Sequence, residues 1–211
     1  MQLSTWLLFS GFAVICTLSP GPAILLSVTN SITHGFLKSI FSSLGNIVGI
    51  FIVSSVAVLG LGAILQTSVF LFTLLKLFGA VYLIYLGIRQ WRSKQNVFMN
   101  NFNSLQADQG KLKSFIQGLI VAISNPKSIL FFTALFPQFV NVSKPIAIQF
   151  FILTMTFMLF SFLSLITYAI SAHSVRSWFS KGTRALWYNR VSGAIFISFG
   201  IGMLRLKNRT S

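Results

Sequence analysis

Two prolines flanking a glycine interrupt the apolar N-terminal stretch of this chain, at Pro20, Gly21 and Pro22. Lys, Arg, Asp and Glu are all absent before Lys38, so the stretch is long enough to cross a bilayer, which takes about 20 apolar residues. Each proline removes a backbone donor and clashes with the preceding turn, so we expect the helix to break here. In hydrocarbon a free carbonyl is costly unless it lines a cavity or contacts protein. The break is therefore either a packed kink or part of a transport site.

The composition is typical of a protein that crosses a membrane several times. Of the 211 residues, 55% are hydrophobic and only 8% are charged, which is more apolar surface than a soluble domain of this size can bury. Lys and Arg number 16 against a single acid, Asp108. These cations lie at the ends of apolar runs, as in membrane proteins with basic cytoplasmic loops. We therefore expect the lipid bilayer as a partner and no nucleic acid, and the single Cys16 excludes an intrachain disulfide.

The apolar runs predict an all-α fold with six transmembrane helices, at about 4–28, 39–64, 69–88, 114–136, 146–170 and 191–206. The connections after the first, third and fifth spans are the more basic ones, so they are expected in the cytoplasm. The cations of the C-terminal tail favour the opposite side, which leaves a five-span arrangement open.

The connections predict how the chain is divided. Residues 91–113 are rich in Asn, Gln, Ser and Lys and form a polar cytoplasmic linker between a first three-helix unit, 1–90, and a second, 114–211. The fifth connection interleaves aromatic and apolar residues with cations, which predicts a helix lying in the cytoplasmic interface. The residues that indicate this interfacial helix are Trp178, Phe179, Leu186 and Trp187.

The two units share short motifs. Pro20 follows Ser19 in the first span, and Pro126 follows Asn125 in the fourth. A second pair of matches opens the third and sixth spans, at Lys76-Leu77-Phe78-Gly79-Ala80 and Arg190-Val191-Ser192-Gly193-Ala194. With an odd number of spans per unit, the two copies have opposite orientations. The pattern therefore predicts two inverted three-helix repeats with broken first and fourth helices, as in secondary transporters.

The paired breaks are the candidate substrate site. A broken helix offers a positive half-helix N-terminus and free carbonyls in one place. This suits a zwitterion, because amides can face its carboxylate and carbonyls its ammonium. The alternative is a pair of proline kinks whose freed carbonyls are satisfied by neighbouring hydroxyls. The candidate substrate-binding residues are Ser19, Pro20, Gly21, Pro22, Asn46, Asn125, Pro126 and Lys127.

Two of these residues have a second interpretation. Lys127 is a charge beside long apolar runs, and an intramembrane charge indicates function. It could hold a substrate carboxylate or take part in proton movement, or it could extend from the end of the fourth span to the interface. Asn46 lies between Gly45 and Gly49, a small-residue pair that predicts close helix packing with an interhelical hydrogen bond. Alternatively Asn46 lines the substrate path.

Several classes of chemistry are excluded by what the spans lack. They contain no Asp or Glu, which excludes carboxylate-based coupling in the membrane and two-carboxylate hydrolysis. No Cys and His set could hold zinc or haem, and no glycine-rich phosphate loop indicates ATP-driven pumping. We therefore expect neither an enzyme nor a cofactor.

The motifs together resemble the LysE/RhtB family of bacterial amino-acid exporters, most closely its homoserine/threonine branch. The resemblance covers nearly the whole chain in family order. It implies an exporter of the bacterial inner membrane with six spans, driven by the proton gradient or the membrane potential, and it allows a homodimer. The stretches that carry it are Leu18-Ser19-Pro20-Gly21-Pro22, His34-Gly35, Leu75-Lys76, Ser124-Asn125-Pro126-Lys127, Leu135-Phe136-Pro137-Gln138-Phe139 and Asn189-Arg190.

One departure from the family bears on the substrate. Similar members often carry an acid within a span, for example in the fifth, where this chain has Leu159-Phe160-Ser161-Phe162. With no acid to balance a second positive charge, a neutral amino acid such as homoserine or threonine is favoured over lysine or arginine. The competing hypothesis is a membrane scaffold or accessory protein that transports nothing.

Overall fold

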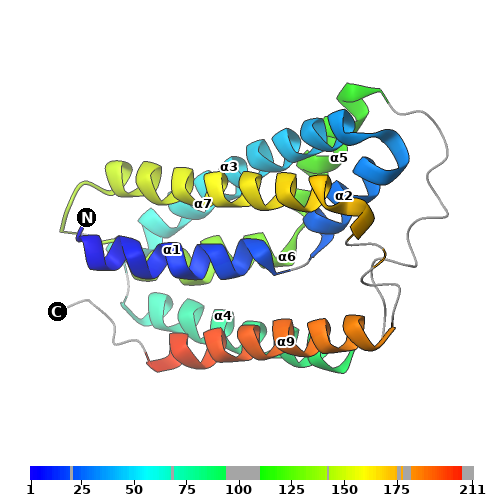
Figure 1. The fold of residues 1–211 in the computed structure, drawn as a ribbon. Coiled ribbons are helices and arrows are strands. Elements are labelled where there is room, and N and C mark those ends of the chain that lie inside the picture. Colours follow the sequence, from blue (N-terminus) through cyan, green and yellow to red (C-terminus); the bar gives the residue numbers. More distant parts are fainter. Residues whose placement is uncertain are drawn as a thin grey trace.

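The computed structural model describes residues 1–19, 21–67, 69–93, 110–141, 143–174, 177 and 182–205. Within these ranges the chain is helical and has no strand, which confirms the predicted all-α class. The helices are α1 (Leu3–Leu18), α2 (Pro22–His34), α3 (Phe36–Thr67), α4 (Val69–Arg92), α5 (Lys111–Ile123), α6 (Pro126–Leu130), the π-helix η1 (Phe131–Leu135), the 3-10 helix η2 (Phe136–Phe139), α7 (Ile146–Ile170) and α9 (Gly182–Arg205) (Figure 1).

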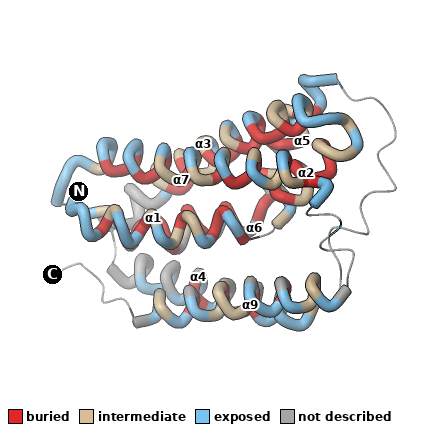
Figure 2. The backbone as a smooth tube through the Cα atoms, viewed as in Figure 1, coloured by how far each residue is buried: buried red, intermediate tan, exposed pale blue. Residues whose placement is uncertain are grey.

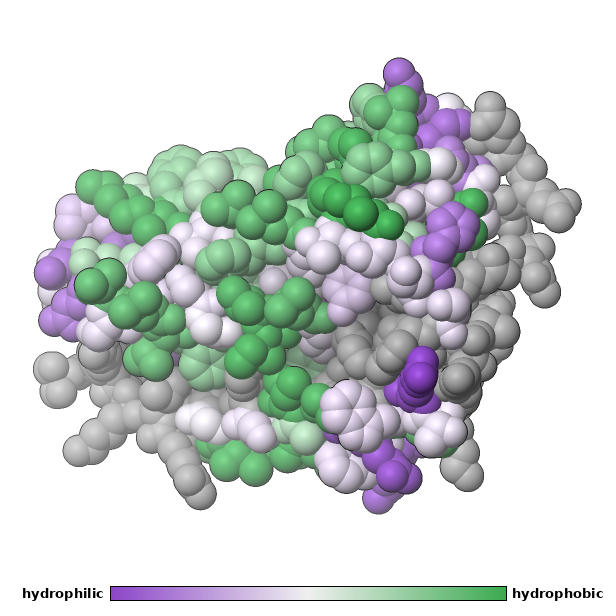
Figure 3. Space-filling view, in the orientation of Figure 1, coloured by the Kyte–Doolittle hydropathy of each residue, from purple (hydrophilic) through white to green (hydrophobic). Residues whose placement is uncertain are grey.

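Two helices in the described ranges are long and apolar enough to cross a membrane, over Phe36–Gly60 of α3 and Ile146–Ile170 of α7. The number rises to four if each bent pair of helices forms one span, and these pairs are Leu3–Leu18 with Pro22–His34 and Lys111–Ser124 with Pro126–Phe139. α4 and α9 are helices at the predicted third and sixth spans. Hydrophobic surface covers much of the middle of the visible face, and hydrophilic residues gather toward its two ends (Figure 3).

The last helix begins earlier than the sequence predicts. α9 starts at Gly182, so Leu186 and Trp187 belong to the helix of the sixth predicted span, and a separate interfacial helix at these two residues is wrong. Long basic side chains can cover apolar surface while their charge reaches the interface, so the cations there did not require the helix to end. Trp178 and Phe179 lie outside the described residues, as do positions 94–109 of the predicted linker.

α3 and α5 pack against each other in parallel through glycines. A Cβ atom at Gly118 of α5 would collide with the carbonyl oxygen of Ser42 on α3. One turn further along, a Cβ at Gly49 of α3 would lie 2.5 Å from the Cβ of Ala122 on α5. Small residues allow helix backbones to approach this closely. The packing predicted for the Gly45 and Gly49 pair is thus confirmed, because Gly45 also lies against the α5 backbone.

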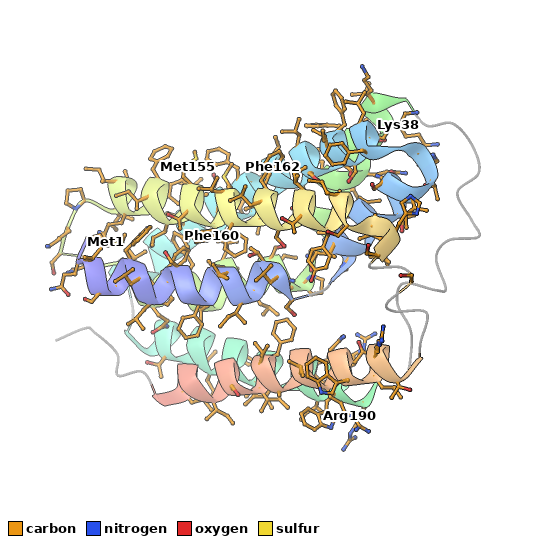
Figure 4. All side chains as sticks on the ribbon, viewed as in Figure 1. Met1, Lys38, Met155, Phe160, Phe162 and Arg190 are labelled. Carbon is orange, nitrogen blue, oxygen red and sulfur yellow. The ribbon has the colours of Figure 1, made fainter. Side chains whose placement is uncertain are left out.

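The remaining helices form two further groups. α1 packs against α7, where Trp6 Nε1 donates a hydrogen bond to Thr156 Oγ1 at 3.1 Å, and Phe160 lies on the side of α7 toward α1 (Figure 4). α2 contacts both α3 and α7. α4 and α9 pack side by side in antiparallel directions and are drawn below the other helices (Figure 1). The close contacts of this pair are Gly87 with Gly193 and Ala80 with Gly200.

The core between the first half of α1, the η helices and the first half of α7 is aromatic. The ring of Phe9 is fully buried and makes edge-on contacts with Phe131, Phe136 and Phe139 at centroid distances of 5.7, 6.1 and 5.3 Å. Such edge-on pairs are favourable beyond the area they bury. The other buried rings of this group are Phe132, Phe150 and Phe157.

The interior around α2 combines a small apolar cluster, which includes Ile24, Val28 and Leu165, with buried polar groups. Ser27 Oγ lies 2.9 Å from Ser39 Oγ of α3 and donates to the carbonyl of Leu165 in α7 at 2.8 Å. Asn30 is 0% exposed, and neither its amide nitrogen nor its amide oxygen has a hydrogen-bond partner among the described residues. Buried residues therefore line the inner faces of α1, α2 and α7 (Figure 2), and toward α2 buried hydroxyl and amide groups accompany the apolar ones.

Candidate functional site

The first break separates α1 from α2. α1 ends at Leu18, Ser19 is its C-terminal cap, and Gly21 is the N-terminal cap of α2. The two helices meet at an angle of 50°. Pro22 takes the first position of α2, where a missing N–H costs nothing because the first N–H groups of a helix have no partner within it. Pro20 lies outside the described residues.

Lys127 reaches this break from the other half of the chain. Its Nζ donates hydrogen bonds to the carbonyl oxygens of Cys16 at 2.8 Å and Ser19 at 2.6 Å. In an uninterrupted helix the carbonyl of Cys16 would accept from the N–H of residue 20, which is a proline and has none. The lysine ammonium therefore replaces the backbone donor that Pro20 removes.

Two side chains of α7 complete the end of α1. Ser164 Oγ donates to the carbonyl of Thr17 at 2.9 Å, and Tyr168 Oη donates to that of Leu18 at 3.0 Å. The last four carbonyls of a helix have no partner within it, and the helical donor for Leu18 would again be a proline, Pro22. Each carbonyl from Cys16 to Ser19 thus accepts from a side chain outside the first two helices.

The second break is built differently. α5 ends at Ile123, and Asn125 caps α6 through its Oδ1, which accepts from the backbone N of Lys127 at 3.1 Å. The two segments meet at 49°. The carbonyl of Ala122, whose helical donor would be Pro126, accepts instead from the backbone nitrogens of Ser124 and Asn125. The carbonyl that loses its donor to Pro126 therefore has local partners and does not need the Lys127 side chain.

The charge of Lys127 has no acidic partner among the described residues, because the chain's single acid, Asp108, lies outside them. A charge at the centre of a bilayer costs about 3 kcal/mol on insertion scales. Hydrogen bonds to a charged group contribute about 1.5–3 kcal/mol each. The two carbonyls can therefore hold a charged ammonium in place, but they do not neutralise it.

Groups that could bind an anion surround this ammonium. An ammonium has three donors, and the carbonyls of Cys16 and Ser19 use two of them. The hydroxyl of Ser19, a residue only 6% exposed, has no partner in the described part of the chain. An ideal Cβ on Gly21 would lie 3.5 Å from Lys127 Nζ, so the ammonium also lies beside the N-terminus of α2, which has no side-chain cap. Helix N-termini attract negative charge.

The structure thus brings together the predicted residues Ser19, Gly21 and Lys127 in one place, with Asn125 positioning the lysine. The carbonyls of the first break face an ammonium, as we expected, but in this structure the ammonium is that of Lys127. The Nζ of Lys127 contacts the carbonyls of Cys16 and Ser19, and the alternative in which Lys127 extends to the membrane interface stays a prediction.

Asn46 lies one helix away from the breaks. It is buried on α3, and its Oδ1 lies 3.5 Å from Ser161 Oγ of α7, a long hydrogen bond. Ser161 is one turn before Ser164, which contacts the first break. The interhelical hydrogen bond predicted for Asn46 is therefore present, and a polar face of α7 connects it with the end of α1.

Ser164 and Tyr168 are the residues that sequence reasoning missed. Both lie in the span 146–170, which is otherwise strongly apolar. The signal that could have found them is their spacing, because Ser161, Ser164 and Tyr168 recur at intervals of three and four residues and so share one face of a helix. A polar face on such a span needs a polar partner, and the end of α1 provides it.

These features define a helical membrane protein whose two broken helices meet through a half-buried lysine. Comparison with known proteins gives the family: residues 14–207 match the LysE type translocator family. The chain therefore belongs to the LysE type translocators, as the sequence motifs predict.

Relatives cover almost the whole chain. The homoserine/homoserine lactone efflux protein of Salmonella typhimurium is 31% identical over 200 residues, which is 95% of this chain and 96% of the relative. An uncharacterized membrane protein of Vibrio cholerae is 28% identical over 204 residues, 97% of each chain. The uncharacterized membrane protein YrhP of Bacillus subtilis is 28% identical over 195 residues, 90% of this chain and 93% of the relative. No solved structure matches the chain.

Proposed function

We propose that this protein exports small neutral amino acids across the bacterial inner membrane, with homoserine and threonine as the first candidates. Its membership of a translocator family and the name of its Salmonella relative support export of an amino acid. The preference for a neutral side chain rests on charge. A half-buried lysine without an acidic partner in the described site can balance a carboxylate, but nothing there balances a second cation.

The observation that carries the proposal is the position of Lys127 Nζ, which lies at the first break beside Ser19 and the N-terminus of α2. The substrate carboxylate would bind to this ammonium, to the hydroxyl of Ser19 and to the N-terminus of α2 beside Gly21. Asn125 and Pro126 set the start of α6, from which Lys127 extends. Pro20 and Pro22 remove the backbone donors for the end of α1, which Lys127 contacts. Asn46 supports the site indirectly, through its contact with Ser161 of α7.

The helix packing supports a multi-pass protein with six spans in two inverted repeats. The first broken helix packs against α7, the second helix of the other unit, and the second broken helix packs against α3. Both pairs are parallel, whereas α4 and α9 are antiparallel, as helices exchanged by a two-fold axis in the membrane plane must be. Lys38 lies at the end of the bundle opposite Met1 (Figure 4), and we place this basic end in the cytoplasm.

The test is export from cells fed dipeptides that contain threonine or homoserine. Cells with the protein should release the free amino acid into the medium faster than cells without it, as measured by mass spectrometry. Lys127→Met should abolish the difference. Lys144→Met is the matched control, because Lys144 is exposed in the connection before α7, and it should export like the wild type. Equal release with and without the protein, for every amino acid tested, would refute the exporter.

A further inference from the structure

We propose that the carbonyl oxygens of Cys16 and Ser19 form an ammonium-binding site that Lys127 fills when no substrate is bound. The substrate's own ammonium then displaces Lys127 from this carbonyl site. The inference deepens the proposed function, because the displacing ligand is the proposed substrate, but the existence of the ammonium site is independent of transport.

The geometry is that of a built site. Two carbonyl oxygens converge on one nitrogen at 2.8 and 2.6 Å, and both belong to the C-terminal end of α1, which carries partial negative charge. The hydroxyl of Ser19, a buried residue, lies at the same turn without a partner in the described part of the chain. Gly21 presents no side chain toward the nitrogen. The chemical class that fits is a primary or secondary ammonium, since a quaternary one has no N–H to donate.

Lys127 can leave this site more easily than the other donors at the end of α1. It reaches the carbonyls from α6 through a flexible four-carbon side chain. Ser164 and Tyr168, by contrast, hold the neighbouring carbonyls from the long helix α7. The exchange of one ammonium for another therefore changes the occupant of the site without freeing the rest of the helix end.

The charges decide which ligands can displace Lys127. An amino acid brings an ammonium for the carbonyls of Cys16 and Ser19, and it also brings a carboxylate for the released Lys127. The number of unbalanced buried charges is then the same before and after binding. A ligand with an ammonium alone, such as a simple alkylammonium, would leave two cations close together, which is costly in a low-dielectric interior. The site therefore selects compounds that carry both groups.

Displacement also links binding to movement. The bonds from Lys127 to Cys16 and Ser19 join residues 111 and 108 positions apart in the chain, and they connect the two broken helices directly. Substrate binding would replace this direct link by one that runs through the substrate, and the link would be lost when the substrate leaves.

The test is chemical rescue of a variant that lacks the lysine. Lys127→Ala leaves the carbonyls of Cys16 and Ser19 without their donor, and an added small ammonium can take its place. Purified protein in detergent is heated with ethylammonium chloride or with tetramethylammonium chloride, which matches the ionic strength but has no N–H. We expect ethylammonium to raise the unfolding midpoint of the variant by about 3 °C or more once its concentration exceeds the dissociation constant about tenfold.

The controls separate the site from a general salt effect. Wild-type protein and Lys144→Ala retain Lys127 and should shift equally little with both salts. If Lys127→Ala does not accumulate, Lys127→Gln retains a neutral N–H donor and is displaced more easily than a charged lysine, so it should still respond to ethylammonium more than the wild type does. An equal response of all these proteins to both salts would overturn the proposal.

The outcome is distinguishable from failure of the proposed function. Rescue by ethylammonium together with no export of any amino acid would support the ammonium site and refute the exporter. Export that depends on Lys127 without any rescue would keep the exporter and remove the displacement.

Discussion

Tyr168→Phe tests whether the end of α1 depends on donors from α7. The change removes one hydroxyl and keeps the ring, so the packing around it is nearly unchanged. In the structure this hydroxyl donates to the carbonyl of Leu18 at 3.0 Å. Interhelical hydrogen bonds in membrane proteins average about 0.6 kcal/mol and reach about 1.7, because the unfolded chain finds other partners in the membrane. The carbonyl of Leu18 has lost its helical donor to Pro22, so we expect a cost in the upper part of this range, about 1–1.7 kcal/mol.

The assay is thermal unfolding in detergent or nanodiscs. A change of 1 kcal/mol shifts the midpoint by about 2–4 °C for chains of 150–250 residues, so Tyr168→Phe should lower it by about 2–7 °C. The matched control is Ser31→Ala. Ser31 Oγ also donates to a carbonyl of α7, that of Ala169 at 2.7 Å, but this carbonyl already accepts from the backbone N of Ser171. Its loss should cost less than about 0.6 kcal/mol. Equal shifts for Tyr168→Phe and Ser31→Ala would show that the missing proline donors do not set the energetics of the break.

Two further predictions concern the second half of the chain. Gly118→Ala should lower the unfolding midpoint by the equivalent of about 1–3 kcal/mol, because the new methyl group meets the backbone of Ser42. The control Gly11→Ala should be neutral or stabilising, because a Cβ at Gly11 meets nothing within 4 Å. A destabilisation by Gly11→Ala as large as that by Gly118→Ala would contradict the close α3–α5 packing. Asn125→Ala removes the N-terminal cap of α6, so it should lower stability by about 1 kcal/mol and reduce Lys127-dependent export. Asn125→Ser retains a capping oxygen and should retain most of the stability and most of the export. Full export by Asn125→Ala would show that the cap does not position Lys127.

The sequence predicts the elements of this fold well because its strongest signals are local. The apolar run of the fifth span predicts 146–170, and α7 has these bounds. Prolines and the Asn125-Pro126 pair predict where the first and fourth helices bend, because a missing N–H and a steric clash act on the nearest turn. The signal that ends α2 is also local, because Gly35 has a φ of +87°, which glycine adopts readily.

The contacts within the site could not be predicted in the same way. The bond from Lys127 to Cys16 joins residues 111 positions apart, and no local preference fixes which carbonyl a long side chain reaches. One part was nevertheless present in the sequence. Pro20 and Pro22 remove the donors of Cys16 and Leu18, whereas the second break has only Pro126. The first break therefore needs donors from elsewhere, and Lys127 and Tyr168 supply them.

The residues on the two sides of the first break differ in polarity. On one side of the first break, the rings around Phe9 fill the core and offer a polar substrate no hydrogen bond. On the other side, α2 carries the hydroxyl of Ser27 and the buried, unpartnered amide of Asn30, groups that a polar molecule or water could satisfy. These groups lie toward His34 and Lys38, at the end that we propose to be cytoplasmic. In the proposed orientation a substrate for export would enter from that side, where it would meet the polar groups of α2 before Lys127, and the aromatic core would lie between Lys127 and the exit.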